Sequence, residues 1–156
     1  MEKLADDIKL LDNDPDEKYR ITDLYQNAKR RIKTGAYEDA VARLYRCSEA
    51  LVDHVLRRRG NESANLRGLK EKIVWMIENG AKEYKLFVDD GKTLEENKLR
   101  YRFPSDARNQ SVLAHGWIAV QKDTAEKYAC WAEDTMRELG FELERFELPR
   151  MPEEWT

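Results

Sequence analysis

The chain has 156 residues, of which 41% are hydrophobic and 38% are charged, and its formal net charge is −3. Seven glycines and four prolines are few for this length, which favours long amphipathic helices over a sheet, and the length suits one domain rather than two. The apolar runs are short and the acidic start MEKLADD lacks the basic flank and apolar core of a signal peptide, so we expect a cytoplasmic protein without a membrane span.

The two cysteines and two histidines give no sign of a metal site. Cys47 and Cys130 are isolated, and form neither a zinc pattern nor a disulfide framework. We expect both to be small buried hydrophobic side chains. His54 has no acidic or cysteine partner at metal-ligand spacing, and we interpret it as a surface or boundary residue. The sequence therefore predicts no metal and no cofactor.

Charge is distributed unevenly along the chain. From Arg20 to Arg59 there are ten Lys or Arg residues against five Asp or Glu, whereas from Glu133 to Glu154 there are three against eight. A basic surface of this kind can guide a phosphate backbone. For most of these residues individually, a solvated helix face is the simpler explanation.

The first half of the chain is predicted to form a helical hairpin. Residues 1–15 are expected to be loosely held. Helices follow at 21–34 and 37–59, with Gly35 and Gly60 as their C-terminal stops, and the short connection predicts antiparallel packing. The apolar stripes that face the core contain Ile21, Leu24, Tyr25, Ala28 and Ile32 in the first helix and Tyr37, Ala40, Val41, Leu44, Ser48, Leu51, Val52 and Val55 in the second.

A third helix and a basic insertion come next. Leu66, Leu69, Ile73, Met76 and Ile77 predict a helix that ends near Gly80. Residues 81–91 are less regular. Thr93-Leu-Glu-Glu96 then matches a capping box that starts a short helix, which is expected to run to about Arg100 before Phe103-Pro104 breaks it. The insertion is either a substrate-specific loop or a plain connector. Its basic residues are Lys92, Lys98, Arg100 and Arg102.

The last part of the chain contains two predicted helices and a tail. Ser105 or Asp106 is expected to cap the first of them, which carries residues 108–116. Asp123 is expected to cap the second, which ends at Gly140. Its predicted core residues are Ala125, Tyr128, Ala129, Ala132, Thr135, Met136 and Leu139. Residues 141–156 are expected to be an extended tail, whose Phe141, Leu143, Phe146 and Leu148 pack on the bundle or on a partner.

These elements predict one domain over residues 1–156. Its fold class is all-α, a bundle of four to five main helices with a basic insertion before the helix that carries residues 108–116.

Residues 108–116, Arg-Asn-Gln-Ser-Val-Leu-Ala-His-Gly, hold the candidate chemistry and are called the motif segment below. In a helix Arg108 and His115 lie seven positions apart, two turns minus about 20°, so both share one face with Ser111. Leu113, Trp117 and Val120 follow helical spacing on the opposite side, so burying them would turn the polar face outward.

Arginine and histidine together suit phosphate chemistry. A guanidinium offers a planar fork of donors to phosphate oxygens, and imidazole exchanges a proton near pH 7. Cleavage of RNA by its own 2′-OH needs one proton removed, another donated, and charge stabilised on the phosphoryl group. One histidine does not easily perform both transfers, so two copies facing each other in a homodimer are expected.

Two stretches resemble a known family. Arg-Asn-x-Ser-x-x-Ala-His-Gly resembles the Arg-x(4–6)-His signature of HEPN-domain ribonucleases, with the six-residue spacing at the long end of that range. Gly-Ala-Tyr-Glu-Asp-Ala-Val-Ala-Arg-Leu-Tyr-Arg-Cys-Ser-Glu-Ala-Leu, residues 35–51, is similar to the helix that precedes the motif in type III CRISPR-associated CARF-HEPN ancillary ribonucleases. We expect no CARF sensor domain within this chain, which is therefore a standalone HEPN protein or an excised C-terminal portion.

The resemblance implies a metal-independent endoribonuclease that acts on single-stranded RNA in prokaryotic defence. It implies that His115 handles the proton and that Arg108 stabilises the phosphoryl charge, while Asn109 and Ser111 orient the substrate or the catalytic pair.

Arg43, Arg46 and Arg102 are the candidate RNA-binding residues, although Arg46 could instead pair with Glu49. Two other readings remain open. One is a non-catalytic HEPN-like module that binds RNA or protein, and the other is a toxin-type HEPN ribonuclease controlled by an antitoxin.

Overall fold

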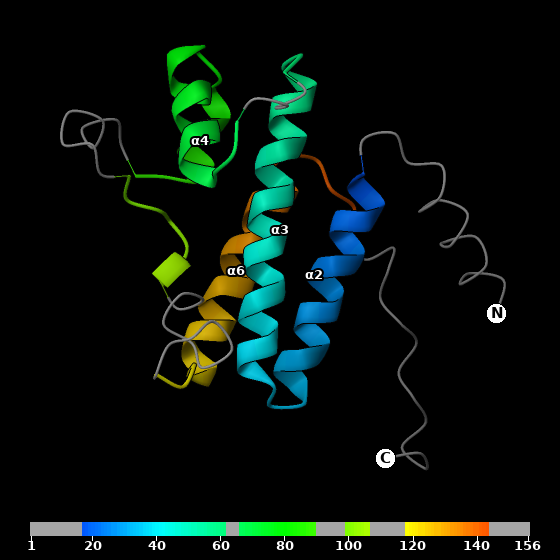
Figure 1. The fold of residues 1–156 in the computed structure, drawn as a ribbon. Coiled ribbons are helices and arrows are strands. Elements are labelled where there is room, and N and C mark those ends of the chain that lie inside the picture. Colours follow the sequence, from blue (N-terminus) through cyan, green and yellow to red (C-terminus); the bar gives the residue numbers. More distant parts are fainter. Residues whose placement is uncertain (1–16, 62–65, 90–98, 107–117, 144–156) are drawn as a thin grey trace, which may run out of the picture.

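A computed structural model describes residues 17–61, 66–89, 99–106 and 118–143. Within them lie four complete α-helices, one 3-10 helix and no strand. Figure 1 shows how the helices are arranged. The elements are α2 (Lys18–Lys33), α3 (Tyr37–Arg58), α4 (Leu69–Glu78), η1 (Lys82–Leu86) and α6 (Lys122–Glu138). The predicted all-α bundle is confirmed. The segment before Glu17, the helix predicted after Thr93 and the tail beyond Leu143 lie outside the described residues, so these expectations and the single-domain boundary stay predictions.

α2 and α3 form the predicted antiparallel hairpin. Gly35 adopts φ 79°, the left-handed region that a residue without a Cβ enters at no steric cost. Its N–H donates to the Ile32 carbonyl at 3.0 Å, and the Ala36 N–H donates to the Arg31 carbonyl at 2.9 Å. This pair of bonds is a Schellman motif, which satisfies carbonyls that the end of α2 leaves open. The chain therefore reverses within the three residues between the helices.

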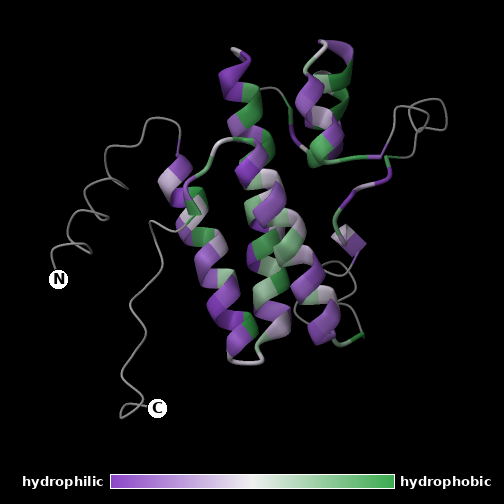
Figure 2. Ribbon diagram, turned by 180° about the vertical axis from the view of Figure 1, so that it is seen from behind, coloured by the Kyte–Doolittle hydropathy of each residue, from purple (hydrophilic) through white to green (hydrophobic). Residues whose placement is uncertain are grey.

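α3 is the central element of the bundle. It packs against α2, α4 and α6, and Figure 1 shows it between α2 on one side and α4 and α6 on the other. Its apolar and polar residues fall on separate faces, a contrast visible along each helix in Figure 2. Its buried residues are Ala40, Val41, Leu44, Cys47, Ser48, Leu51, Val52, His54, Val55 and Leu56. Each large apolar side chain buried there stabilises the fold by about 1.5–3 kcal/mol before entropy is counted.

Most predicted core residues are buried, and four expectations were wrong in detail. His54 is 1% exposed rather than at a boundary, because α3 is covered on several sides at its C-terminal end. Cys130 is exposed, because it faces away from the bundle on α6. α4 begins at Leu69 rather than Leu66. Asp123 lies one residue inside α6, where Gln121 takes the capping position, and it pairs with Lys127 at 2.9 Å.

A short bridge closes the base of the insertion. Val88 and Tyr101 form an isolated antiparallel pair. The Asp89 N–H donates to the Arg100 carbonyl at 2.8 Å, and the Arg102 N–H donates to the Phe87 carbonyl at 2.9 Å. The two ends of the insertion are thereby held side by side next to η1.

No helix in the described ranges is long and apolar enough to cross a membrane.

Candidate functional site

The predicted catalytic residues lie outside the described residues. Arg108, Asn109, Ser111 and His115 fall between Asp106, where the described chain pauses, and Ile118, where it resumes. Their mutual geometry therefore stays a prediction. What the structure describes is how the chain is held on either side of the motif segment.

The approach to the motif segment is anchored by a group of rings that we call the aromatic cluster: Phe87, Tyr101, Phe103, Tyr128 and Trp131. Phe103 is 4% exposed and lies at its centre, with ring centroids 4.4 Å from Trp131, 5.2 Å from Tyr101 and 5.5 Å from Tyr128. Tilted and stacked ring contacts of this kind add about 0.5–1.5 kcal/mol each beyond their burial. The chain is thus fixed against α6 five residues before Arg108.

Helical backbone begins directly after this anchor. Ser105 and Asp106 are already helical, so Pro104 takes the capping position that we had predicted for Ser105 or Asp106. Beyond the motif segment, Ile118 is 62% exposed, and Val120 packs against the core before α6 begins. Leu113 and Trp117, the other predicted members of that stripe, lie outside the described residues.

A buried hydrogen-bond chain joins the aromatic cluster to α3. The Ser48 hydroxyl donates to the Leu44 carbonyl at 2.9 Å, and its oxygen lies 2.7 Å from the Tyr128 hydroxyl. Because Ser48 has one hydroxyl hydrogen, the Tyr128 O–H must be the donor in the second bond. Burial raises the pKa of Tyr128 well above its ordinary value, against the opposing effect of the Ser48 bond, so the phenol stays protonated. The sequence placed both residues on core stripes but did not show that they meet.

The cluster is also tied to η1. The indole N–H of Trp131 donates to the Leu86 carbonyl at 3.0 Å. The sequence did not identify Phe103, Trp131 and Tyr101 as positioning residues. Tyr101 and Phe103 lie before the motif segment and Trp131 lies on α6, so no single helical spacing connects them. The one available signal was the density of aromatic residues on both sides of the motif segment.

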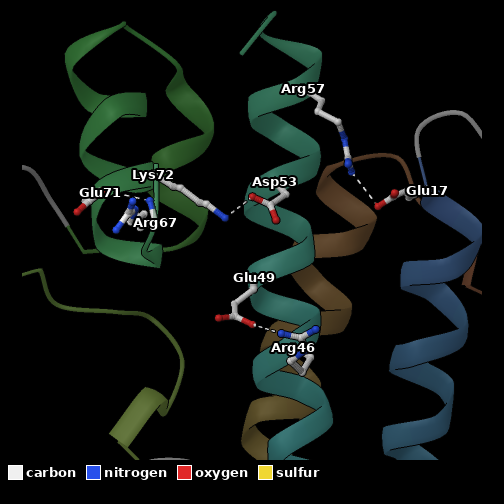
Figure 3. A network of polar contacts seen from close by, with 8 residues as sticks. All are labelled: Glu17, Arg46, Glu49, Asp53, Arg57, Arg67, Glu71 and Lys72. Atoms are coloured by element: carbon white, nitrogen blue, oxygen red, sulfur yellow. Dashed lines mark hydrogen bonds and ion pairs between the residues drawn. The ribbon is translucent and has the colours of Figure 1, made fainter. Parts of the chain in front are cut away.

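The three candidate RNA-binding arginines each have an acidic partner. Arg43 donates to Asp39 at 3.1 Å, and Arg46 donates to Glu49 at 3.3 Å, as Figure 3 shows for the second pair. The alternative weighed for Arg46, pairing with Glu49, is thus observed. Arg102 lies 3.5 Å from Asp89 at the base of the insertion.

These ion pairs are on the surface. Arg46 is 76% exposed, and Arg102 is 48% exposed. Exposed pairs contribute about 0–1 kcal/mol, so a phosphate can replace a carboxylate at small cost. Asp39 differs from the other two acids, because it also forms an ion pair with Arg31, with an N–O distance of 3.0 Å. Of the three arginines, Arg43 is the most firmly engaged.

No group of three or more His, Cys, Asp or Glu side chains within the described ranges is placed to hold a metal ion.

Comparison with known proteins identifies the family. The model of the Csm6 HEPN domain, a CRISPR-associated HEPN family, matches residues 13–95, which is more than half of the chain. The match contains α2, α3, α4 and η1 and ends before Arg108. No curated protein and no solved structure matches the chain significantly. On the strength of the family match and the all-helical bundle, the chain belongs to the Csm6 HEPN domain family.

Proposed function

We propose that this chain is a metal-independent endoribonuclease that cleaves single-stranded RNA in CRISPR-linked defence. Membership in the Csm6 HEPN domain family is the observation that carries the proposal. Membership in this family supports a catalytic role for Arg108 and His115, because their Arg-x6-His spacing resembles the signature of HEPN ribonucleases.

The roles follow from the needs of 2′-OH attack. His115 transfers the proton, and Arg108 stabilises the charge that builds on the phosphoryl oxygens. Asn109 and Ser111 orient the substrate or the catalytic pair. No step in this scheme needs a metal ion, because attack, proton transfer and charge stabilisation are all assigned to RNA and protein groups.

A composite site in a homodimer supplies the second histidine. The chain has two histidines, and His54 is buried in α3 with 1% of its surface exposed. His54 therefore does not serve an RNA strand in the folded chain. A second copy brings a second His115, so that one imidazole removes the 2′-OH proton and the other protonates the leaving oxygen.

RNA contacts extend beyond the catalytic pair in this proposal. Arg46 and Arg102 exchange their exposed carboxylate partners for backbone phosphates, and Arg43 contributes from the neighbouring turn of α3. Regulation comes from a partner, either a CARF sensor domain or an antitoxin.

The test is incubation of the purified chain with labelled single-stranded RNA in EDTA. Wild type should cleave and leave 2′,3′-cyclic phosphate or 3′-phosphate ends, and a 2′-deoxy nucleotide at the scissile position should block the cut. His115→Ala should lose on the order of 10²-fold or more in rate. Arg108→Lys should also be impaired, because an ammonium does not reproduce the bidentate fork.

Light scattering of the same samples examines the dimer. Wild type and both variants should be dimers at micromolar concentration with unchanged circular dichroism. A fully active monomer would remove the composite site, and strict dependence on Mg²⁺ or Mn²⁺ would remove the metal-independent mechanism.

One observation favours a second candidate, a HEPN-like module that binds RNA or protein without cleaving. Arg43, Arg46 and Arg102 are all paired within the chain, as they would be in a domain whose basic residues stabilise only the fold. Absence of cleavage by both wild type and His115→Ala would support this module, whereas equal cleavage by both would remove His115 from the mechanism. A toxin-type ribonuclease shares the chemistry and would be recognised by a neighbouring antitoxin gene.

A further inference from the structure

A second candidate site lies at the C-terminal end of α6, away from Ile118, where the described chain resumes. A hollow of about 660 Å³ opens where α3 and α6 end, and α2 and η1 complete its wall. The motif segment rejoins the described chain at Ile118, just before the first residue of α6. At 1.5 Å rise per residue the two ends of α6 are about 25 Å apart. The hollow, which we call the basic hollow, is therefore separate from the point where the motif segment meets α6.

Positive charge exceeds negative charge around the basic hollow. Its lining includes Lys18, Arg58, Arg59 and Lys82 against two carboxylates, Glu83 and Glu138. Arg59 forms an ion pair with Glu83, with N–O distances of 2.8 and 2.7 Å. Partial burial by itself would raise the pKa of the Glu83 carboxyl, but the bonds to Arg59 lower the pKa below its ordinary value.

Three lining cations have no carboxylate partner within the described ranges, and one of them, Lys18, lies 5.7 Å from the centroid of the Phe141 ring. Across the described part of the chain, Lys18, Arg58 and Lys82 form no ion pair with a carboxylate. Arg57, one residue from Arg58, turns away to Glu17 at 3.1 Å (Figure 3). Uncompensated cations around a hollow with protein walls concentrate the potential that attracts an anion.

The lining of the basic hollow also contains apolar residues that are buried or half-buried. Val55 is 2% exposed and His54 is 1% exposed, whereas Arg58 and Lys82 are exposed at the surface. The imidazole of His54 meets Phe141 edge-on, with ring centroids 5.2 Å apart at 70°. Leu86 and Leu139, both half-buried, extend this surface. A ligand that matches the hollow carries an anion at one end and a flat, weakly polar group at the other.

We infer that the basic hollow binds a small phosphorylated ligand of mononucleotide size. The guanidinium of Arg58 and the ammonium of Lys82 contact the phosphate, and the ring of the ligand lies against Val55 and Leu139. The volume falls within the range of about 300–1,000 Å³ that is usual for small-molecule sites. The inference does not depend on the ribonuclease proposal, because no motif residue takes part.

Calorimetry of the full chain with uridine 5′-monophosphate at low salt tests the inference. We expect one nucleotide bound per chain, with weaker binding of inorganic phosphate and of uridine, since each offers only half of the contacts. The double variant Arg58→Gln/Lys82→Gln should weaken binding by about tenfold or more, the scale of losing charge-assisted contacts.

The control is Arg20→Gln/Lys85→Gln, which removes the same charge from equally exposed positions on α2 and η1 that do not line the hollow. This control should change affinity by less than about twofold, because neither side chain lines the hollow or contacts the nucleotide. Equal weakening in both double variants would overturn the inference, as would the absence of binding at millimolar nucleotide.

Nuclear magnetic resonance locates the ligand. The chain has two histidines, so the variant His115→Gln assigns their imidazole signals. Uridine 5′-monophosphate should shift the His54 signal and leave that of His115 in place. A shift of His115 alone would place the nucleotide at the motif segment and overturn the inference. Loss of RNA cleavage in His115→Gln would leave this result unaffected, so the two proposals fail independently.

Discussion

The aromatic cluster and the basic hollow share helix α6 but are built from opposite kinds of side chain. In the cluster, Phe103 and Tyr128 are almost fully buried, and the Tyr128 hydroxyl and the Trp131 indole N–H are both hydrogen-bonded. In the hollow, Arg58 and Lys82 stay exposed beside the buried His54. The first region excludes water, and the second leaves charge in contact with it.

This difference suits the two regions to different roles: the aromatic cluster positions the chain, and the basic hollow binds a ligand. Dry, interlocking rings resist displacement, so the aromatic cluster is suited to hold the approach to the motif segment in one place. Uncompensated cations around a hollow with protein walls concentrate a potential that attracts an anion, so the basic hollow is suited to a ligand. Variants in the cluster should therefore change stability, whereas variants in the hollow should change binding.

Phe103→Ala should have the largest effect on stability. Removing this buried ring leaves a cavity among Tyr101, Tyr128 and Trp131, and such truncations cost about 3–5 kcal/mol. The rate of RNA cleavage should also fall, even at temperatures where the variant is still folded, because the motif segment loses its anchor. Chemical denaturation measures the first effect and the RNA assay the second.

Ile118→Ala is the matched control on the far side of the motif segment. Its side chain is 62% exposed, so the variant should change the free energy of unfolding by less than about 0.5 kcal/mol. A comparable loss in both variants would mean that the cluster is not the anchor.

Alkaline pH should weaken the core around the cluster. Burial raises the pKa of the Cys47 thiol from an ordinary value of 9.0 to about 12. A group with a raised folded pKa contributes its full stability below pH 9 and loses it as the pH rises to 12, by up to about 1.4 kcal/mol per pH unit. Burial raises the pKa of Tyr25 and Tyr128 in the same direction.

Denaturation at a series of pH values from 8 upward measures this effect. Cys47→Ala should flatten the decline above pH 9, whereas Cys130→Ala, at an exposed position, should leave it unchanged. An unchanged slope in Cys47→Ala would show that the thiol does not contribute.

Ser48→Ala and Tyr128→Phe should differ although they break the same contact. Ser48→Ala leaves the buried Tyr128 O–H without its acceptor, at a cost of about 1–3 kcal/mol. Tyr128→Phe leaves Ser48 still bonded to the Leu44 carbonyl, at a cost of about 1 kcal/mol. Thermal and chemical denaturation of both variants measure the difference. The reverse order would mean that Ser48, not Tyr128, donates in the shared bond.

Loss of an ion pair on α3 should have a modest effect on stability, and the effect should increase with the burial of the pair. Lys72 lies 2.6 Å from Asp53 and ties α4 to α3, with the lysine side chain 16% exposed (Figure 3). Lys72→Met should cost about 1–2 kcal/mol, between the values for exposed and buried pairs. Arg46→Gln removes an exposed pair and should cost less than about 0.5 kcal/mol. Equal costs in urea denaturation would contradict this ranking.

Helices with a clear apolar period were predictable, and contacts between distant segments were not. The stripe of α3 and the stops at Gly35 and Gly60 followed from local rules and are confirmed. The predicted burial of His54 and Cys130 was wrong, because a single apolar stripe per helix does not show how many neighbours cover the helix. α3 is instead covered by three helices, and α6 leaves a whole face open. The catalytic roles of Arg108 and His115 stay predictions.

The amino-acid sequence by itself determined the helices and their hairpin connection, because spacing and side-chain type act within a few turns; the class of chemistry that it predicts stays a prediction. Only the tertiary structure decided which rings surround Phe103, which partner accepts the Tyr128 hydrogen bond, and which cations gather near His54. Each of these contacts joins residues far apart in the chain, such as Ser48 and Tyr128, and their meeting depends on how complete helices pack together.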